Sequence, residues 1–171
     1  MTAEGKPAHV ERDGPLATIV IDHPPLNLFG EPLVRSLAEA VAEVESSDAR
    51  ALIVRAEGQV FTGGADVKGF EGLTAEQGAQ VFRQGLHLMH QVEALPIPTI
   101  SAVHALCLTA GFELSLACDM IWAAESAQFG LVEAVVGLTP GWRHPAARRA
   151  SRAWASARVR DVGAAVRRCD A

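Results

Sequence analysis

The chain has 171 residues, of which 49% are hydrophobic and 20% charged, and its formal net charge is −5. This composition is too apolar for a disordered chain and sufficient for one domain with a real core. Residues 1–15 lack the apolar stretch of a signal peptide, and no apolar run reaches the roughly 18 residues that cross a bilayer. The three cysteines, Cys107, Cys118 and Cys169, show no CxxC spacing, so we expect reduced, mostly buried thiols in a cytoplasmic protein.

Hydrophobic periodicity predicts strands that alternate with helices. In chain order we expect a strand over 17–22, a helix over 31–46, a strand over 51–55, a long helix over 74–95, a strand over 99–103, a short apolar helix over 110–118 and a strand over 120–124. Thr74 and Gln77 have the spacing of a capping box at the start of the long helix. Strands that are apolar on both faces, alternating with helices, are typical of an α/β fold.

Charge divides the chain near Gly141. Residues 1–141 hold 7 Lys/Arg and 18 Asp/Glu, a formal charge of −11. Residues 142–171 hold 8 Arg and 2 Asp, a formal charge of +6, and their apolar residues are mostly alanine. We therefore treat 1–141 as the folded core and 142–171 as a separate tail that we expect to be poorly ordered.

Three segments of the core carry residues suited to chemistry. Gly63-Gly64 ends a strand where backbone N–H groups can approach a ligand, although an ordinary glycine turn explains the pair equally well. Glu113 lies on an otherwise apolar helix, where it either has a chemical task or pairs with the positive helix start. Glu133 is the sole charge of its apolar stretch and faces either solvent or a cavity.

Together these segments resemble the enoyl-CoA hydratase/isomerase (crotonase) family over residues 16–141. The matching motifs, in order and spacing, are Phe61-Thr-Gly-Gly-Ala-Asp66, Ala110-Gly-Phe-Glu113 leading to Ala117-Cys-Asp119, and Phe129-Gly-Leu-Val-Glu133 leading to Gly137-Leu-Thr-Pro-Gly141. The resemblance implies an α/β fold that is a spiral of ββα units and that binds acyl-CoA thioesters. Coenzyme A is then part of the substrate, and no separate cofactor or metal is expected.

The resemblance also implies residue roles. Glu113 would activate water and Glu133 would deliver a proton, and the presence of both favours a hydratase over an isomerase. The backbone N–H groups of Ala65 and Ala110 would form the oxyanion hole, although the family usually has glycine at the second position. The implied substrate-binding residues are Gly64, Ala65, Asp66, Val67, Lys68, Ala110 and Gly111.

Two other patterns carry less weight. His87, His90 and Glu93 form an HxxHxxE run, but histidines three apart on an exposed helical face are usually unliganded, so we expect no metal site. The arginine-rich tail has one aromatic residue beyond Trp142, and it has no RNA-binding signature. We therefore expect no nucleic-acid partner, and no membrane insertion.

The tail is explained by a shift of reading frame. Relatives of the family continue after Gly-Leu-Thr-Pro-Gly with Gly-Gly-Thr-Gln-Arg-Leu, whereas this chain continues with Trp142-Arg-His-Pro-Ala-Ala-Arg148. Codons for the observed residues, read one base later, permit the family residues at every position. We therefore interpret 142–171 as an out-of-frame translation, from a real frameshift or a sequencing error.

The family's C-terminal helices would then be missing. By resemblance they complete the acyl-CoA pocket and join subunits into trimers and hexamers, so we expect oligomerisation to be compromised. The leading function is hydration of trans-2-enoyl-CoA in fatty acid metabolism. The alternatives are an isomerase or another crotonase-type reaction, and a non-catalytic remnant that associates with intact paralogues.

We predict that the chain aggregates readily and has little hydratase activity, whereas a frame-restored version is soluble and active. Uncovering about 400 Å² of apolar surface forfeits on the order of 10 kcal/mol, comparable to a domain's whole stability. Expression of the two versions side by side, followed by thermal melting and turnover assays, tests this. A short chain that melts cooperatively with turnover near that of the restored protein would contradict it.

Overall fold

The computed structural model describes residues 5–139, 141 and 142. In chain order the described elements are β1 (Ala8–Asp13), β2 (Leu16–Ile21), α1 (Glu31–Glu45), β3 (Ala51–Ala56), the 3-10 helix η1 (Val67–Phe70), α2 (Ala75–Ala94), β4 (Thr99–Val103), β5 (Leu106–Leu108), α3 (Thr109–Ala117), β6 (Met120–Ala123), β7 (Gln128–Gly130) and the 3-10 helix η2 (Glu133–Val136). Of the predicted tail, residues 142–171, the structure describes only Trp142, so the expected disorder of residues 143–171 stays a prediction.

The chain winds as a spiral. One sheet has the order β1-β2-β3-β4-β6, in which only the β1–β2 pair is antiparallel. A second layer follows the same order, because Phe29 bridges Ala65, Thr62 bridges Cys107, and β5 pairs in parallel with β7. The α/β spiral expected from the resemblance is therefore confirmed.

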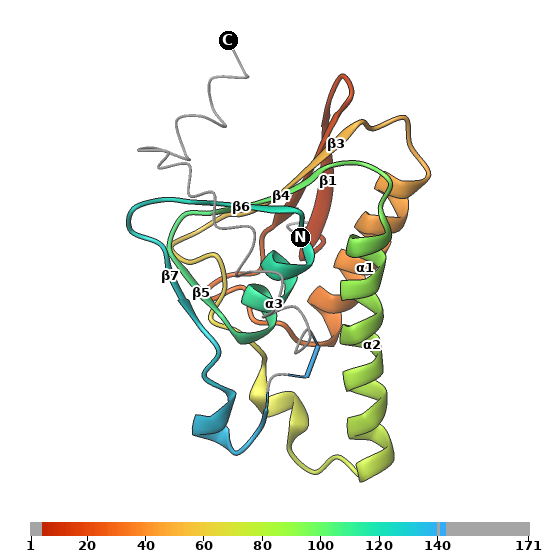
Figure 1. Cartoon of the computed structure of the whole chain (residues 1–171). Coiled ribbons are helices and arrows are strands. Elements are labelled where there is room, and N and C mark those ends of the chain that lie inside the picture. The colour runs from red at the N-terminus through yellow and green to blue at the C-terminus, as the bar shows by residue number, and fades with distance from the viewer. Residues whose placement is uncertain (1–4, 140, 143–171) are drawn as a thin grey trace.

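Helices α1 and α2 lie side by side along one flank of the spiral, and α3 lies between α2 and the second layer (Figure 1). The amphipathic face of α1 buries Leu33, Leu37 and Val41, and α2 contributes Leu88 and Met89 to the same core. Each of these side chains is almost fully removed from water, and burial of this kind contributes about 1.5–3 kcal/mol per side chain. The core thus holds the two long helices against the sheet.

The predicted strands and helices are all present, with ends that differ by a residue or so. The capping box is also confirmed, because the Thr74 hydroxyl accepts from the Gln77 N–H and the Gln77 side chain accepts from the Thr74 N–H. The strand β1 was not predicted; it lies within residues 1–15, where the sequence shows no apolar stretch. This strand is at the sheet edge and is mostly exposed, so it lacks the apolar alternation that reveals a strand.

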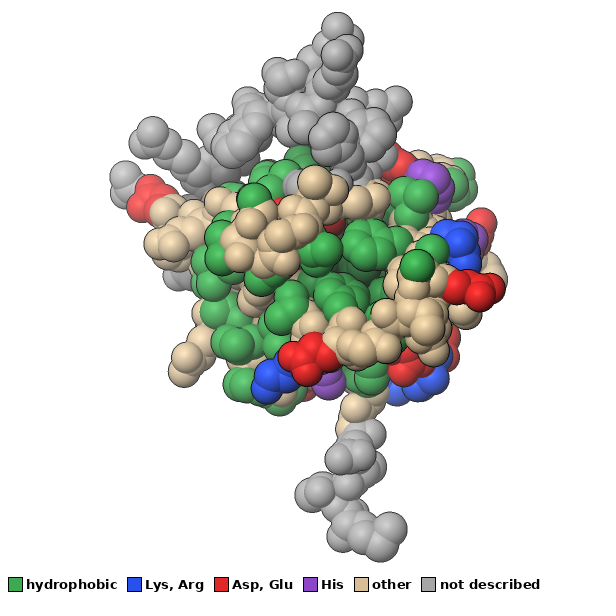
Figure 2. Space-filling model, turned by 90° about the horizontal axis from the view of Figure 1, so that it is seen from below, with side chains coloured by type: hydrophobic (Ala, Val, Ile, Leu, Met, Phe, Trp, Pro, Cys, Tyr) green, Lys and Arg blue, Asp and Glu red, His purple; other side chains and the backbone are tan. Residues whose placement is uncertain are grey.

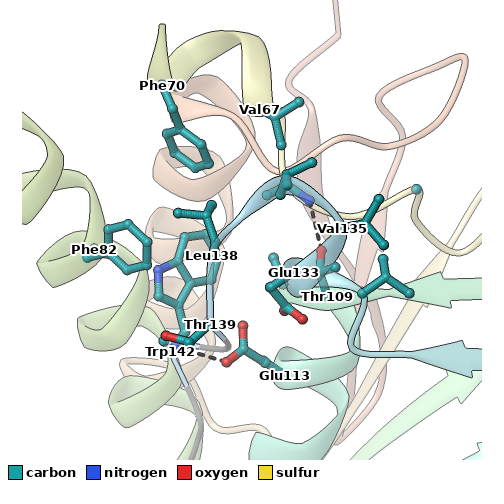
Figure 3. A pocket seen from close by; sticks show the side chains of 16 residues that line it. Val67, Phe70, Phe82, Thr109, Glu113, Glu133, Val135, Leu138, Thr139 and Trp142 are labelled. Atoms are coloured by element: carbon teal, nitrogen blue, oxygen red, sulfur yellow. Dashed lines mark hydrogen bonds between the residues drawn. The ribbon is translucent and has the colours of Figure 1, made fainter. Parts of the chain in front are cut away.

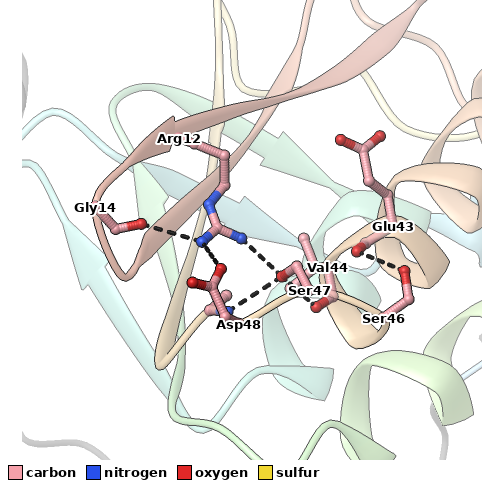
Figure 4. A network of polar contacts seen from close by, with 8 residues as sticks. Arg12, Gly14, Glu43, Val44, Ser46, Ser47 and Asp48 are labelled. Carbon is pink, nitrogen blue, oxygen red and sulfur yellow. Dashed lines mark hydrogen bonds and ion pairs between the residues drawn. The ribbon is translucent and has the colours of Figure 1, made fainter.

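Charged side chains at the sheet edge connect β1 to the end of α1 (Figure 4). The Arg12 guanidinium donates to the Asp48 carboxylate at 2.6 Å, to the Ser47 hydroxyl at 2.7 Å and to the Gly14 carbonyl at 3.0 Å. Asp48 is largely exposed, so this ion pair adds little stability by itself. The cluster instead fixes the β1–β2 turn relative to the α1–β3 connection.

The described thiols agree with the expectation of buried cysteines. Cys107 and Cys118 are free and buried, and burial raises the pKa of each thiol to about 12. Cys169 lies outside the described residues. Among the described elements, no helix is both long and apolar enough to span a membrane.

Asn27 organises the loop that follows β3. Its backbone has a φ of 50°, in the left-handed region that asparagine tolerates better than most residues. Its side-chain N–H groups donate to the carbonyls of Glu57 and Val60 at 2.9 and 3.1 Å, and its amide oxygen accepts from the His23 N–H at 2.7 Å. The Asn27 side chain is buried, so without it no water could take its place as the hydrogen-bond partner of these backbone groups.

We predict that Asn27→Ala lowers the free energy of unfolding by about 2–4 kcal/mol, because it leaves buried backbone groups unpaired and strains the backbone. Asn27→Gly should lose less stability than Asn27→Ala, because glycine removes the backbone strain but not the loss of the side-chain hydrogen bonds. Ser46→Ala, which removes an exposed hydrogen bond, serves as a control with little effect. Chemical denaturation of the three variants measures the differences. Equal stability of Asn27→Ala and wild type would refute the role given to this side chain.

Candidate active site

A cavity of about 270 Å³ opens at the end of the spiral where η1, η2 and the start of α2 lie. Seen from that end, the surface is predominantly apolar around a hollow (Figure 2). Four valines that line the cavity are also substantially exposed: Val67, Val132, Val135 and Val136. Apolar walls with a few polar groups are typical of a small-molecule site.

The loop after β3 forms one wall because neighbouring segments hold it by main-chain hydrogen bonds. The Thr62 N–H donates to the Leu106 carbonyl at 3.0 Å, and the Leu108 N–H donates to the Thr62 carbonyl at 3.2 Å. On its other side, the Phe29 N–H donates to the Gly64 carbonyl at 2.8 Å. Three stretches that are far apart in the sequence therefore share one rigid layer.

The two predicted oxyanion residues lie on the same cavity. Ala65 and Ala110 both line it, the first from the loop after β3 and the second from the first turn of α3. The Ala65 N–H donates to the Thr109 hydroxyl at 3.0 Å (Figure 3). Thr109 has a φ of 45°, a conformation that costs a β-branched residue about 1–3 kcal/mol.

Gly64 is needed beside this hydroxyl. A Cβ at residue 64 would lie 2.3 Å from the Thr109 hydroxyl oxygen, and the backbone there has a φ of 101°. Both facts exclude a larger residue. The glycine pair seen in the sequence therefore serves close packing against Thr109, in addition to the turn that we considered.

Glu113 points into the cavity from α3 and is 4% exposed. The backbone N–H of Trp142 donates to its Oε1 at 2.9 Å (Figure 3). The Trp142 ring is itself buried, and it lies so close to Gly85 of α2 that a Cβ there would clash at 2.1 Å. The main chain just after Gly141 thus fixes the orientation of this carboxylate.

Glu133 begins η2 and points toward Glu113 across the cavity (Figure 3). It is 9% exposed, and neither carboxylate oxygen has a hydrogen-bond partner among the described residues. A buried carboxyl without a partner is costly for folding. Glu133 therefore faces the cavity rather than solvent, which decides between the two possibilities left open by the sequence.

Of the other residues predicted to bind substrate, some line the cavity and some do not. Val67 lines the cavity, whereas Gly64, Asp66, Lys68 and Gly111 are not among its lining residues. The Asp66 side chain accepts from the Lys68 N–H and caps η1, and Lys68 is exposed. Gly111 permits close packing, because a Cβ there would lie 2.0 Å from the Thr62 methyl.

Several cavity residues were not singled out by the sequence. Thr109 reaches a loop 44 residues away, a contact that no local pattern reveals. Trp142 was assigned to the tail on charge and composition, yet it is buried against Phe29 at a ring distance of 6.3 Å. The valines around η2 were noted only as part of an apolar stretch, and their place in the cavity wall was not predicted.

A metal site is not evident in the part of the chain that the structure describes. No group of three or more His, Cys, Asp or Glu side chains there is placed to hold an ion, and this includes the HxxHxxE run on α2. Among the described residues that line the cavity, Glu113 and Glu133 carry the ionisable side chains.

Residues 11–161 match the family model described as enoyl-CoA hydratase/isomerase, a match that extends beyond Gly141 into the arginine-rich segment. A relative named "Probable enoyl-CoA hydratase" from Bacillus subtilis is 33% identical over 129 residues, covering 74% of this chain and 50% of the relative. The human "Enoyl-CoA hydratase domain-containing protein 2, mitochondrial" is 43% identical over 119 residues, covering 67% of this chain and 40% of the relative. The chain therefore spans half or less of the length of these two relatives.

Solved structures agree with the fold. An enoyl-CoA hydratase from Bacillus anthracis superposes with a TM-score of 0.74 at 31% identity, covering 80% of this chain and 54% of that one. An enoyl-CoA hydratase from Mycobacterium smegmatis gives a TM-score of 0.79 at 26% identity, covering 84% of this chain and 57% of that one. The matching family model, the identity to curated relatives and the spiral fold agree, and the chain belongs to the enoyl-CoA hydratase/isomerase family.

Proposed function

We propose that the site carries out enoyl-CoA hydratase chemistry, the addition of water to a trans-2-enoyl-CoA to give a 3-hydroxyacyl-CoA. The observation that carries the proposal is the pair Glu113 and Glu133, which face each other across one apolar cavity beside Ala65 and Ala110. Relatives named as hydratases, among them the "Short-chain-enoyl-CoA hydratase" of Clostridium acetobutylicum at 29% identity, support it.

The backbone N–H groups of Ala65 and Ala110 stabilise the charge that develops on the thioester oxygen. Water attack at C3 of the enoyl group places negative charge on this oxygen, in an enolate-like state. Preorganised N–H donors in a site sheltered from water stabilise such a charge, each by about 3 kcal/mol. Ala110 lies in the first turn of α3, where the helix dipole adds to the effect.

The two carboxyls move the protons. Glu113, oriented by the Trp142 N–H, accepts a proton from water while the water oxygen bonds to C3. Glu133 delivers a proton to C2, so that H and OH are added across the double bond. The site is reset when the proton gained by Glu113 returns to Glu133 through solvent.

The apolar walls receive the acyl part of the substrate. Val67, Phe70 and Phe82 line the side formed by η1 and α2, and Val132 and Leu138 line the side formed by the η2 segment. The proposed reaction uses the coenzyme A of its substrate and requires no separate cofactor. We further propose a role in fatty acid metabolism in the cytoplasm.

Product analysis separates this function from its rivals. A hydratase converts trans-2-butenoyl-CoA to the 3-hydroxy product with loss of the conjugated absorbance, whereas an isomerase acts on trans-3-enoyl-CoA and adds no water. A non-catalytic remnant shows neither reaction. Isomerase turnover without hydration would overturn the proposal.

We predict that Glu113→Gln and Glu133→Gln each lower kcat for hydration at least about a hundredfold, the usual scale for acid–base groups. The assays use the frame-restored version, because it carries the full pocket expected for the family, and its expected glycine at residue 142 keeps a backbone N–H for Glu113. Glu125→Gln, which removes an exposed carboxyl outside the cavity, should leave kcat unchanged. Near-normal turnover of either cavity variant would remove that glutamate from the mechanism.

A second prediction concerns the oxyanion donor on α3. Ala110→Gly keeps the backbone N–H and should change kcat/KM little, whereas Ala110→Pro removes the N–H and should lower kcat/KM by about a hundredfold or more. Thermal melting of both variants separates loss of the donor from loss of the fold. An Ala110→Pro variant that folds and turns over normally would place the donor elsewhere.

A further inference from the structure

The Thr109 hydroxyl occupies the position that a substrate oxygen would take on the Ala65 N–H. The distance between Ala65 N and Thr109 Oγ1 is 3.0 Å, within the range at which an N–H donor binds a carbonyl oxygen. Thr109 lines the same cavity as Glu113 and Glu133. The hydroxyl is thus an internal acceptor placed inside the proposed site.

The surrounding packing fits a hydroxyl in this position. Gly64 leaves room for it, since a Cβ there would lie 2.3 Å from Thr109 Oγ1. The side chain of Thr109, whose backbone is left-handed, points toward the loop after β3, where its hydroxyl accepts from the Ala65 N–H (Figure 3). Two unusual backbone conformations, at residues 64 and 109, therefore meet at one hydrogen bond.

Threonine cannot easily clear the position. Its Cβ carries a hydroxyl, a methyl and a hydrogen, which exchange places among three staggered rotamers. A rotation that removes the hydroxyl brings either the methyl or the hydrogen to the vacated place. Only one of the three rotamers therefore leaves room for a substrate oxygen on the Ala65 N–H.

We propose that Thr109 is a specificity-determining residue that competes with the acyl thioester for the Ala65 donor. This inference rests on the proposed function, because it assumes that the thioester oxygen binds at this N–H. The hydroxyl holds the donor in the empty site and is displaced when an acyl-CoA binds. Removal of the hydroxyl should then strengthen the binding of acyl-CoA and leave the binding of free CoA unchanged, since free CoA has no thioester carbonyl.

The test compares Thr109→Ala, Thr109→Val and Thr109→Ser in the whole 171-residue chain and, in parallel, in the frame-restored version. Calorimetry measures the Kd of butyryl-CoA and of free CoA. We expect Thr109→Ala to bind butyryl-CoA about threefold to tenfold more tightly, the scale of one net hydrogen bond. Thr109→Ser, which keeps the hydroxyl, should bind within about twofold of wild type on the same scale.

Thr109→Val separates the hydroxyl from the shape of the side chain. Valine places a methyl where the hydroxyl was, so Thr109→Val should free the Ala65 N–H of its acceptor without strengthening butyryl-CoA binding, while Kd for free CoA stays constant. Hydrogen exchange of the Ala65 amide, followed by NMR without ligand, should be slow in wild type and Thr109→Ser and faster in Thr109→Ala. This second readout does not depend on acyl-CoA.

Three results would overturn the proposal. Equal exchange of the Ala65 amide in wild type and Thr109→Ala would show that the hydroxyl does not hold this donor. Weaker butyryl-CoA binding by Thr109→Ala would mean that the hydroxyl assists the substrate instead. If the exchange differs but no version binds butyryl-CoA, the proposed function itself fails, and the competition proposed here fails with it.

Discussion

The arrangement of the site depends on how the loop over residues 62–66 is held between two other segments. Its backbone is bonded to the stretch around Leu26–Phe29 on one side and to β5 on the other. Asn27 secures the first of these segments through its buried side chain, and the Thr62 hydroxyl donates to the Asn27 carbonyl at 2.7 Å. Because these hydrogen bonds hold the loop on both sides, the Ala65 N–H has a fixed direction. An oxyanion donor must have such a direction before the substrate arrives.

The second constraint is the placement of two carboxyls in an apolar wall. Glu113 is on a helix whose other buried residues are apolar or small, and Glu133 begins a short helix with valines that are exposed around the cavity. A fold selected for stability alone would not bury two acids facing each other, since each must be desolvated. The cost becomes understandable if both groups exchange protons with a substrate. Both residues lie on one cavity, as their two separate motifs led us to expect.

Much of the fold and part of the site were predictable from the sequence, for physical reasons. Buried strands such as β3 and amphipathic helices such as α1 and α2 are recognisable from the spacing of their apolar residues, which follows the face that each element buries. The strand β1 is mostly exposed and lacks apolar alternation, and the strands β5 and β7 have three residues each, too short to show a period. The hydrogen bond between Thr109 and Ala65 depends on two backbone conformations 44 residues apart, which no local pattern specifies. Trp142 illustrates the same limit, because charge and composition assigned it to the tail while its ring packs against α2.

The measurement that tests the account most directly is a crystal structure of the protein with bound butyryl-CoA. The account predicts that the thioester oxygen lies roughly 2.7–3.1 Å from the backbone nitrogens of both Ala65 and Ala110, the spacing of an oxyanion hole. It also predicts that C2 and C3 of the acyl group lie between the carboxyls of Glu113 and Glu133, with the Thr109 hydroxyl turned away from Ala65. An acyl group bound elsewhere, or a thioester oxygen that contacts neither nitrogen, would contradict the central claim.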